Sequence, residues 1–487
     1  MLYHSTRGSS APVSGAEAVL KGLADDGGLY MMDRIPSFDA VECLSKDTMG
    51  MATQILSALL PDIPQMEQLV KRAYIGKFET EELTPTRKVG PFTVLELFRG
   101  PTSAFKDVAL CMLPQLLTSA KKLAGMEEEI LILTATSGDT GKAALAGFAD
   151  VPGVGICVFY PDGGVSAVQR AQMVTQKGSN VRACAVEGNF DDAQTGVKNI
   201  FAACSDGELL KGKGFRLSSA NSINIGRLAP QITYYFKAYR DLLDRGEITM
   251  GDQVNFCVPT GNFGDILAGY LAKLLGLPVG RLICASNANK VLADFFHSGT
   301  YDRRRELRKT DSPSMDILVS SNLERLLYLL SGQDAALVGE LMAQLNAQGF
   351  YTVPESLKAA TDELFWADFG GDGATSETIR DVWDLYGYLC DTHTAVAWYV
   401  AENYVNQTGD QRPMVVLSTA SAFKFPAAVL AAIGGDTAGD EFEQMERLSQ
   451  LTGWPIPSNL AGLRELEELH TGVIPKEQML PYVLGDS

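Results

Sequence analysis

The chain has 487 residues, of which 46% are hydrophobic and 21% are charged, so it can bury a large core and is not a disordered protein. Its formal charge of −18 argues against a nucleic-acid-binding protein, but it is compatible with a small anionic substrate in a locally positive pocket. The longest uncharged run, residues 448–463, contains two prolines, so we expect no membrane span.

The first residues and the cysteines indicate the cellular compartment. Residues 1–22 lack the apolar stretch of a secretory signal and include Glu17. The eight cysteines lie far apart without a C-x-x-C pair, which is typical of reduced packing thiols rather than of disulfides or a metal site. We therefore expect a cytoplasmic protein without a bound metal.

In chain order, residues 1–91 show mainly helical patterning, and the pattern changes at about residue 92. Short apolar runs then predict strands, with helix-length segments between them. The predicted strands are 130–133, 155–160, 181–186, 254–258, 282–285 and 414–417, and the helices between them include 140–149, 228–243 and 265–275. This alternation predicts an α/β fold with mostly parallel sheets, because strands that are apolar throughout must be covered on both faces.

We divide the chain into three regions. An N-terminal, mainly helical region spans 1–91. A large α/β domain comprises 92–129 and 216–487, and it carries a helical insertion at about 300–380, where the strand rhythm is interrupted. A smaller α/β domain spans 130–215.

Three predicted strands run into polar loops, which is where open α/β sheets bind ligands. These loops are TSGDTG at 136–141, TGNFG at 260–264 and STAS at 418–421. In the first two, glycines let the backbone approach a ligand, and amide groups at a helix start attract an anion. Each loop alone is also typical of a capped helix start. The first is not a P-loop, because Thr136 stands where the first glycine belongs.

A candidate lysine precedes these loops. The segment LELFRGPTSAFKDVALCML at 95–113 leads through a Gly-Pro turn to Lys106 and an apolar helix. A lysine that is desolvated beside anion-binding loops would have a lowered pKa suited to a Schiff base. A lysine beside an aspartate is more often a solvated surface residue, and the pattern alone does not choose between the two.

Together, these motifs resemble the threonine synthase family of fold type II pyridoxal-phosphate enzymes. The matching segments follow the family's order along nearly the whole chain: STRG, LELFRGPTSAFKD, LTATSGDTGKAA, YPDGGVSAVQRAQM, SANSINIGR, VPTGNFGD, HTAVA and LSTASAFKF. The resemblance implies two open α/β domains with mostly parallel sheets, the smaller one mobile, beside the N-terminal region. It also implies pyridoxal 5′-phosphate as the cofactor.

The resemblance assigns a role to each matching position. Lys106 would carry the cofactor covalently and act as the acid–base. The 261–264 loop would hold the cofactor phosphate, and Asp139 would lie against the cofactor's 3′-oxygen. Thr419, with Ser418 as the second choice, would face the ring nitrogen. The implied cofactor residues are therefore Lys106, Asp139, Gly261, Asn262, Phe263, Gly264 and Thr419.

The resemblance also implies substrate-binding residues, which are Thr136, Ser137, Gly138, Thr140, Ser222, Arg227 and Asn262. Ser222 and Arg227 would bind the substrate phosphate. A dianionic phosphate needs a fixed cation, and arginine presents a planar fork of donors, although Arg227 could also be a surface residue at a helix start.

Some positions need separate treatment. Arg99 stands where the family commonly has histidine, and Ser421 and Ala422 replace a His-Pro pair. His393 matches the family, but a lone histidine before an apolar helix favours a structural role, so we leave it out of the catalytic set.

The implied reaction converts O-phospho-L-homoserine and water to L-threonine and phosphate, in a monomer without nucleic-acid or membrane partners. A threonine or serine dehydratase of the same fold would share Lys106 and the phosphate loop, but it would not need Ser222 and Arg227. A phospho-lyase that stops at 2-oxobutanoate and a non-catalytic cofactor-binding protein are further alternatives. The departure at 421–422 keeps the phospho-lyase open, whereas the retained lysine and glycine loops speak against the binding protein.

Overall fold

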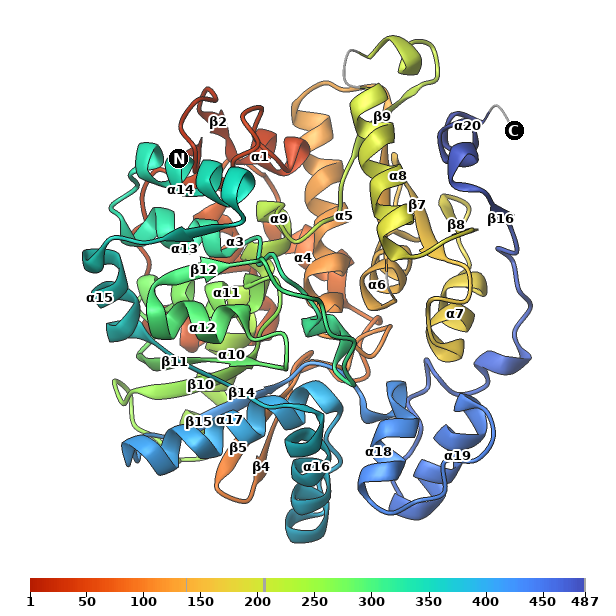
Figure 1. Cartoon of the computed structure of the whole chain (residues 1–487). Helices are drawn as coiled ribbons and strands as arrows, with labels where there is room; N and C mark the ends of the chain where they lie inside the picture. Colours follow the sequence, from red (N-terminus) through yellow and green to blue (C-terminus); the bar gives the residue numbers. More distant parts are fainter. Residues whose placement is uncertain (137, 205–206, 486–487) are drawn as a thin grey trace.

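The computed structural model describes residues 1–136, 138–204 and 207–485, and it forms two lobes on either side of helix α5 (Lys106–Leu123) (Figure 1). The strands of the larger sheet, in spatial order, are β14 (Phe365–Phe369), β11 (Val279–Ser286), β10 (Val254–Pro259), β15 (Met414–Ser418), β5 (Phe92–Glu96) and β4 (Thr86–Val89). Those of the smaller sheet are β16 (Val473–Ile474), β8 (Val181–Val186), β7 (Val154–Pro161), β6 (Glu129–Ala135) and β9 (Phe215–Ser218).

All neighbouring strands of these two sheets pair in parallel, except β4 with β5. The six strands predicted from the sequence are all present, which confirms the predicted α/β class with mostly parallel sheets.

Helices cover both faces of the larger sheet. Helices α11 (Gly264–Leu274) and α12 (Val291–Ser298) pack on one face, and α17 (Thr392–Thr408) packs on the other. Successive side chains of a strand point to opposite faces, so Phe256 joins the core with α11 while Cys257 joins the core with α17. This double burial explains why the strands are apolar throughout.

The smaller sheet is also covered on both faces. Helix α6 (Asp139–Phe148) packs on one face of β7, and α8 (Phe190–Ala203) packs on the other. Helices α5 and α6 approach closely, because a Cβ on Gly147 would lie 2.1 Å from the Leu110 carbonyl oxygen. Glycine is therefore required where the smaller lobe meets α5.

The N-terminal region contains a small antiparallel sheet as well as the predicted helices. The sheet has the order β2 (Val13–Ser14), β1 (Leu2–Ser5) and β3 (Tyr30–Met32). The helices are α1 (Gly15–Lys21), α2 (Ala40–Leu44), α3 (Thr48–Leu59) and α4 (Met66–Tyr74). Because β4 pairs with β5, the last residues of this region belong to the larger sheet.

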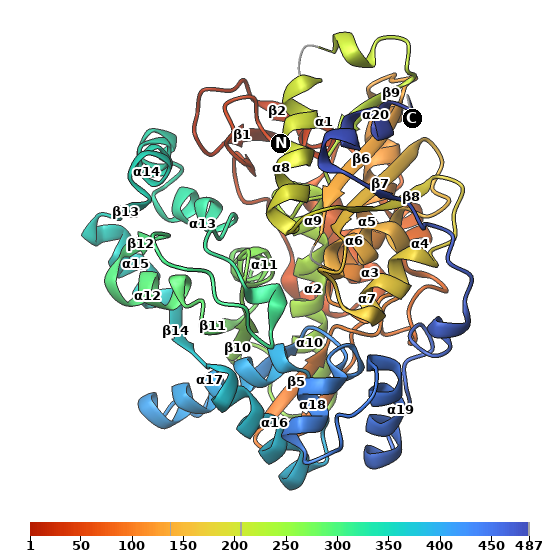
Figure 2. The same cartoon turned by 45° about the vertical axis from the view of Figure 1, so that its right-hand side comes forward.

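The C-terminal segment crosses to the smaller lobe, which differs from the predicted boundaries. Strand β16 pairs with β8, and α20 (Met479–Leu484) packs on α8, as both views show (Figures 1 and 2). Residues 473–484 therefore do not belong to the larger domain. Strand β9 likewise extends the smaller sheet beyond residue 215. Pairing between segments this far apart in the chain leaves no local pattern in the sequence.

The segment 300–380 is not purely helical. Its elements are the hairpin β12 (Thr300–Asp302) and β13 (Phe350–Thr352), the edge strand β14, and helices α13 (Leu323–Leu330), α14 (Ala335–Gln348), α15 (Glu355–Leu364) and α16 (Asp372–Tyr386). The prediction of a helical insertion was therefore wrong for β14, which belongs to the larger sheet.

The remaining helices complete the lobes. The predicted helix 228–243 is divided at Pro230, which lacks an N–H, into α9 (Ile225–Leu228), a 3-10 turn at Ala229–Gln231 and α10 (Ile232–Asp244). The others are α7 (Ala167–Val174), α18 (Pro426–Ala432) and α19 (Glu441–Thr452). All eight cysteines are buried, as expected of packing thiols. None of the helices in the described residues is long and apolar enough to cross a membrane.

Candidate active site

Three loops converge on the N-terminus of α5, where Lys106 is the first helical residue. They follow the carboxyl ends of β6, β10 and β15, as the sequence predicted. The Phe105 amide donates to the Thr419 carbonyl oxygen at 2.8 Å, which places the loop after β15 next to the lysine. These loops therefore form the candidate site around Lys106.

The amine of Lys106 is desolvated, and neighbouring charges shift its pKa. Its Nζ donates to Ser314 Oγ at 3.3 Å. Burial is the main cause that lowers the pKa of Lys106 to about 8; Asp139 opposes this effect, and the cations Lys424 and Arg227 reinforce it. A lowered pKa leaves more of the amine neutral near pH 7, which is the form that attacks a carbonyl carbon.

Asp139 is paired with a cation that the sequence analysis did not single out. Lys424 Nζ lies 2.5 Å from Asp139 Oδ1, and both side chains are buried. Gln169 Nε2 donates to the same oxygen at 3.0 Å. Burial would raise the pKa of Asp139, but the ammonium groups of Lys424 and Lys106 outweigh it and hold this pKa well below its usual range. Asp139 is therefore a fixed carboxylate beside Lys106.

The loop after β10 has the shape of an anion cup. Phe263 adopts a left-handed backbone with φ of 66°, and α11 begins at Gly264 with its amide groups unpaired within the helix. A Cβ on Gly261 would lie 2.7 Å from the Ser314 carbonyl oxygen, so this position requires glycine. The Asn322 amide donates to the Asn262 carbonyl oxygen at 3.0 Å and fixes the loop. Such a helix start is suited to a phosphate.

Arg227 is a buried cation without a counter-ion in the described residues. One of its terminal nitrogens donates to the Ala220 carbonyl oxygen at 2.6 Å, and its buried Nε has no hydrogen-bond partner in the part of the chain that the structure describes. Burial lowers the pKa of Arg227 to about 10. A buried charge with an unused donor is costly unless an anion completes it. The predicted surface alternative for Arg227 is therefore wrong, because the side chain is buried.

Asn322 brings the segment with Ser222 to the phosphate loop. Its Nδ2 donates to the carbonyl oxygens of Ser222 at 3.2 Å and of Asn262 at 3.1 Å. Sequence reasoning missed Asn322, which lies in the segment that we took for an insertion.

The loop after β6 is held mainly by hydrogen bonds within itself. The Thr136 hydroxyl accepts hydrogen bonds from two backbone amides of its own loop, at 2.9 and 3.0 Å. Gly138 has φ of 145°, and a Cβ there would lie 2.4 Å from the Gln169 side chain. Thr140 is half-buried in the first turn of α6. Ser137 lies outside the described residues. The Thr136 hydroxyl is thus already used within the loop.

The two candidate hydroxyls after β15 differ in their partners. Ser418 Oγ forms a 2.9 Å hydrogen bond with Thr394 Oγ1. The Thr419 hydroxyl makes no hydrogen bond with the described residues. Among the described residues, therefore, the Thr419 hydroxyl is without a partner, whereas that of Ser418 is already paired.

The departures from the family pattern have structural partners. Arg99 pairs with Glu96 at 2.5 Å and with Glu79 at 3.1 Å. Ser421 caps the 3-10 turn Ala422–Lys424 by accepting from the Phe423 amide at 3.3 Å. Ser421 thus supports the turn that delivers the buried lysine partner of the site carboxylate.

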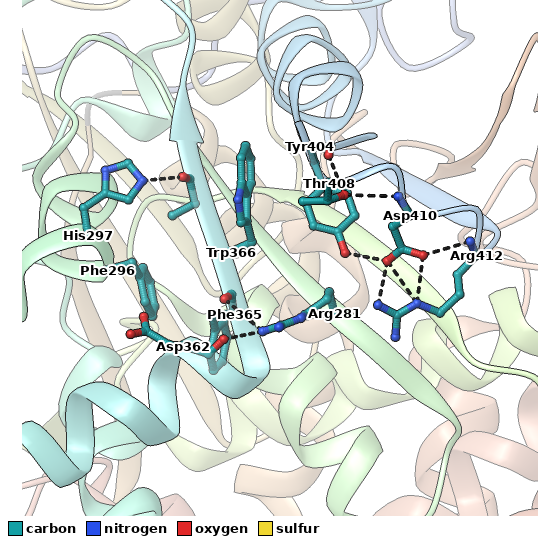
Figure 3. Close-up of a pocket in the computed structure, with 11 residues that line it drawn as sticks. Arg281, Phe296, His297, Asp362, Phe365, Trp366, Tyr404, Thr408, Asp410 and Arg412 are labelled. Carbon is teal, nitrogen blue, oxygen red and sulfur yellow. Dashed lines mark hydrogen bonds and ion pairs between the residues drawn. The ribbon is translucent and has the colours of Figure 1, made fainter. Parts of the chain in front are cut away.

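A separate cavity of about 460 Å³ lies at the opposite end of the larger sheet, near the starts of β11, β14 and β15 (Figure 3). Its arginines are engaged: Arg412 pairs with Asp410 at 2.6 Å, and Arg281 donates to the carbonyl oxygens of Asp362 and Phe365. This cavity does not contain the lysine or the glycine loops.

The residues around Lys106 fit pyridoxal phosphate. A desolvated lysine can bond to its aldehyde carbon, and the helix start beside Gly261, where no Cβ fits, can hold its phosphate. The Nε of Arg227 keeps an unused donor among the described residues.

Comparisons with known proteins agree with this fit. The family described as "Threonine synthase N terminus" matches residues 2–74, "Pyridoxal-phosphate dependent enzyme" matches 78–353, and "Threonine synthase, C-terminal" matches 394–476. A threonine synthase of Pseudomonas aeruginosa is 40% identical, over 96% of this chain and 98% of its own. "Threonine synthase-like 1" of Macaca fascicularis is also 40% identical, over 86% of this chain, but the match spans only 58% of that relative's length.

Solved structures agree as well. The PLP-bound threonine synthase of Brucella melitensis has a TM-score of 0.88 and 38% identity, covering 100% of this chain and 99% of that one. Threonine synthase from yeast has a TM-score of 0.88 and 33% identity, covering 100% and 98%. The fold type II architecture predicted from the motifs is thereby confirmed. The chain belongs to the threonine synthase family of pyridoxal-phosphate-dependent enzymes.

Proposed function

We propose that the protein is a threonine synthase, which converts O-phospho-L-homoserine and water to L-threonine and phosphate. The observation that carries this proposal is the buried, uncompensated Arg227 near Lys106. The cofactor phosphate would occupy the 261–264 loop, so Arg227 remains for a second phosphate on the substrate. A threonine or serine dehydratase has no use for a second phosphate site.

In this proposal, pyridoxal phosphate supplies the electron sink that stabilises negative charge at the substrate's α-carbon. Lys106 carries the cofactor, and its Nζ moves protons at the α- and β-carbons of the substrate. Thr419 would face the ring nitrogen with a neutral hydroxyl, and Asp139 would lie against the 3′-oxygen. Water adds at the β-carbon after phosphate leaves the γ-carbon.

The substrate is held at both ends. Arg227 and Ser222 bind its phosphate together with Asn262, and the loop with Thr136, Ser137, Gly138 and Thr140 lines the end with the carboxylate. That loop belongs to the smaller lobe, so closure of this lobe over the substrate would exclude water from early steps. Structures with and without substrate test the closure; an unchanged lobe position would contradict it.

The test of the reaction is a product assay on the cofactor-loaded protein with O-phospho-L-homoserine, in which phosphate, threonine and 2-oxobutanoate are measured together. Equimolar threonine and phosphate are expected. Phosphate with 2-oxobutanoate would identify a phospho-lyase instead. If no product is released while the cofactor is bound, the proposed substrate is wrong.

We also propose that the enzyme acts as a cytoplasmic monomer without nucleic-acid or membrane partners. The acidic balance of the chain supports the absence of a nucleic-acid partner. Light scattering after size exclusion tests the oligomeric state, and a mass of about twice 52.5 kDa would contradict the monomer. Cell fractionation tests the compartment.

A further inference from the structure

One segment outside the family motifs that we recognised closes over the site. Residues 310–322, here called the cap segment, contact both the lysine and the phosphate loop. Ser314 Oγ accepts from Lys106 Nζ at 3.3 Å, and Ser320 Oγ donates to the Gly261 carbonyl oxygen at 2.7 Å. The cap segment therefore forms a wall of the site.

The base of the cap segment is fixed by buried polar groups. Asp316 Oδ1 accepts from the Nδ2 atoms of Asn287 and Asn289, both at 2.8 Å, and from Thr310 Oγ1 at 2.7 Å. Asn287 follows directly after β11, and Asn289 lies two residues further on. The segment that carries Ser314 is thus anchored to the same end of the larger sheet as the other loops.

His393 fixes the backbone of Ser314 by a hydrogen bond. The Ser314 backbone amide donates to His393 Nε2 at 3.1 Å, and His393 Nδ1 lies 2.7 Å from Asp391 Oδ2. A backbone amide can only donate, so Nε2 is the unprotonated nitrogen and Nδ1 carries the hydrogen that it donates to the carboxylate. Both side chains are buried at the start of α17, where Asp391 is the N-cap residue and His393 lies in the first turn. The histidine is therefore an oriented acceptor aimed at one backbone atom.

We propose that Ser314 is part of the active site, where its hydroxyl holds the Lys106 amine whenever the lysine is free, and that Asp391 and His393 are positioning residues that fix Ser314 through its amide. The proposal rests on the role of Lys106 in the proposed function.

The chemistry of the lysine explains why such a holder is useful. A lysine amine is carried on a flexible four-carbon chain, so its orientation is no longer fixed once it is released from the cofactor. A hydroxyl can accept one N–H of the amine without adding a negative charge, so it orients the nitrogen and does not stabilise the ammonium form as a carboxylate would. Ser314 thus suits an amine that must both attack and accept protons.

The test measures how fast the full-length apoprotein captures pyridoxal phosphate. In this step Lys106 Nζ bonds to the aldehyde carbon and one water leaves; borohydride then fixes the product, and peptide mass locates it. Ser314→Ala should slow capture about tenfold, because one hydrogen bond to the amine is lost. Ser314→Thr keeps the hydroxyl and should restore the rate. Ser298→Ala, at an exposed hydroxyl beyond the site, is the matched control and should not change it.

The positioning role is tested by His393 variants. His393→Ala should slow capture by a similar factor, and His393→Gln should recover most of the rate because its side-chain oxygen can accept from the Ser314 amide. The double variant Ser314→Ala/His393→Ala should be no slower than the slower single variant, because both changes act through one contact. Urea unfolding of each variant checks the fold. If His393→Ala does not fold, His393→Gln and the two Ser314 variants still decide the two parts of the proposal.

The inference would be overturned if Ser314→Ala captured the cofactor at the wild-type rate. It would also be overturned if the rate losses of the two single variants multiplied in the double variant. The positioning part would be overturned if folded His393→Gln captured the cofactor as slowly as folded His393→Ala. Cofactor capture needs no substrate, so the two proposals can fail separately. Normal capture without threonine production would refute the proposed function alone.

Discussion

Replacing Arg227 by glutamine is expected to weaken catalysis and, at the same time, to stabilise the apoprotein. The side chain is buried, its Nε has no partner among the described residues, and one terminal nitrogen binds the Ala220 carbonyl oxygen. Because the residue is a cation whose charge is uncompensated, its contributions to function and to stability have opposite signs.

The structure gives the size of both effects. Burial lowers the pKa of Arg227 from 12.5 to about 10, which at about 1.36 kcal/mol per pKa unit means that the charge costs the folded apoprotein about 3 kcal/mol. The variant also loses the hydrogen bond to Ala220, which destabilises it by about 1.5 kcal/mol. Arg227→Gln should therefore stabilise the apoprotein by a net of roughly 1–2 kcal/mol. Two charge-assisted hydrogen bonds to the substrate phosphate are together worth about 3–4 kcal/mol, so kcat/KM should fall about 100- to 1000-fold.

The assay combines steady-state kinetics with O-phospho-L-homoserine, cofactor titration and urea unfolding of the apoprotein. Arg227→Lys keeps the charge but loses the planar fork, so its kcat/KM should lie between those of the wild type and Arg227→Gln. Cofactor affinity should change less than about threefold. The reasoning is refuted if cofactor affinity falls in proportion to activity, or if Arg227→Gln destabilises the apoprotein, because either result makes the arginine a structural clamp.

Three further outcomes are expected. Burial raises the pKa of Asp265 to about 7, so its charge destabilises the folded protein by about 4 kcal/mol at pH 8, and this destabilisation vanishes below about pH 4. Asp265→Asn should therefore stabilise the apoprotein at about pH 8 and not at about pH 4, and equal effects at the two pH values would contradict this. Gly261→Ala places a Cβ 2.7 Å from a backbone oxygen and should lower cofactor affinity at least about tenfold, whereas Gly373→Ala, which meets no atom within 4 Å, should leave it unchanged. Cofactor capture should rise with pH around a midpoint near 8, the pKa of Lys106, and Asp139→Asn should move the midpoint to lower pH because it removes the charge that raises this pKa; an upward move would show that the carboxylate acts otherwise.

The sequence was most informative where local composition is enough. Strands β10 and β15 could be predicted because burial on both faces makes most of their residues apolar, with Asn255 and Ser418 as the exceptions. Strand β16 has two residues, one exposed and one half-buried, and exists only because it pairs with β8, so no local pattern marks it. Strand β14 was hidden because it lies between helices α15 and α16 and buries only two of its five residues, so it does not read as a strand covered on both faces.

The same distinction applies to the site. Lys106 and the 261–264 loop could be found because glycines and a lysine stand next to predicted strands or turns. Ser314 lies 208 residues away from Lys106 in the chain, in a segment with no motif that we recognised, and only the folded structure brings its hydroxyl to the amine. Lys424 was quoted within a motif, yet its burial depends on its partner Asp139, which the sequence does not reveal.

The return of β16 to the smaller sheet has a consequence for the order in which the protein matures during synthesis. Gly472, at the start of this strand, follows its contact Cys184 by 288 residues. At about 5–20 residues per second, a ribosome needs on the order of 15–60 s to bridge that interval. Until β16 is synthesised, the outer edge of β8 has no strand to pair with, and an unpaired edge can pair with other chains. Nascent chains of this protein therefore pass through a window in which chaperone binding at β8 would matter most.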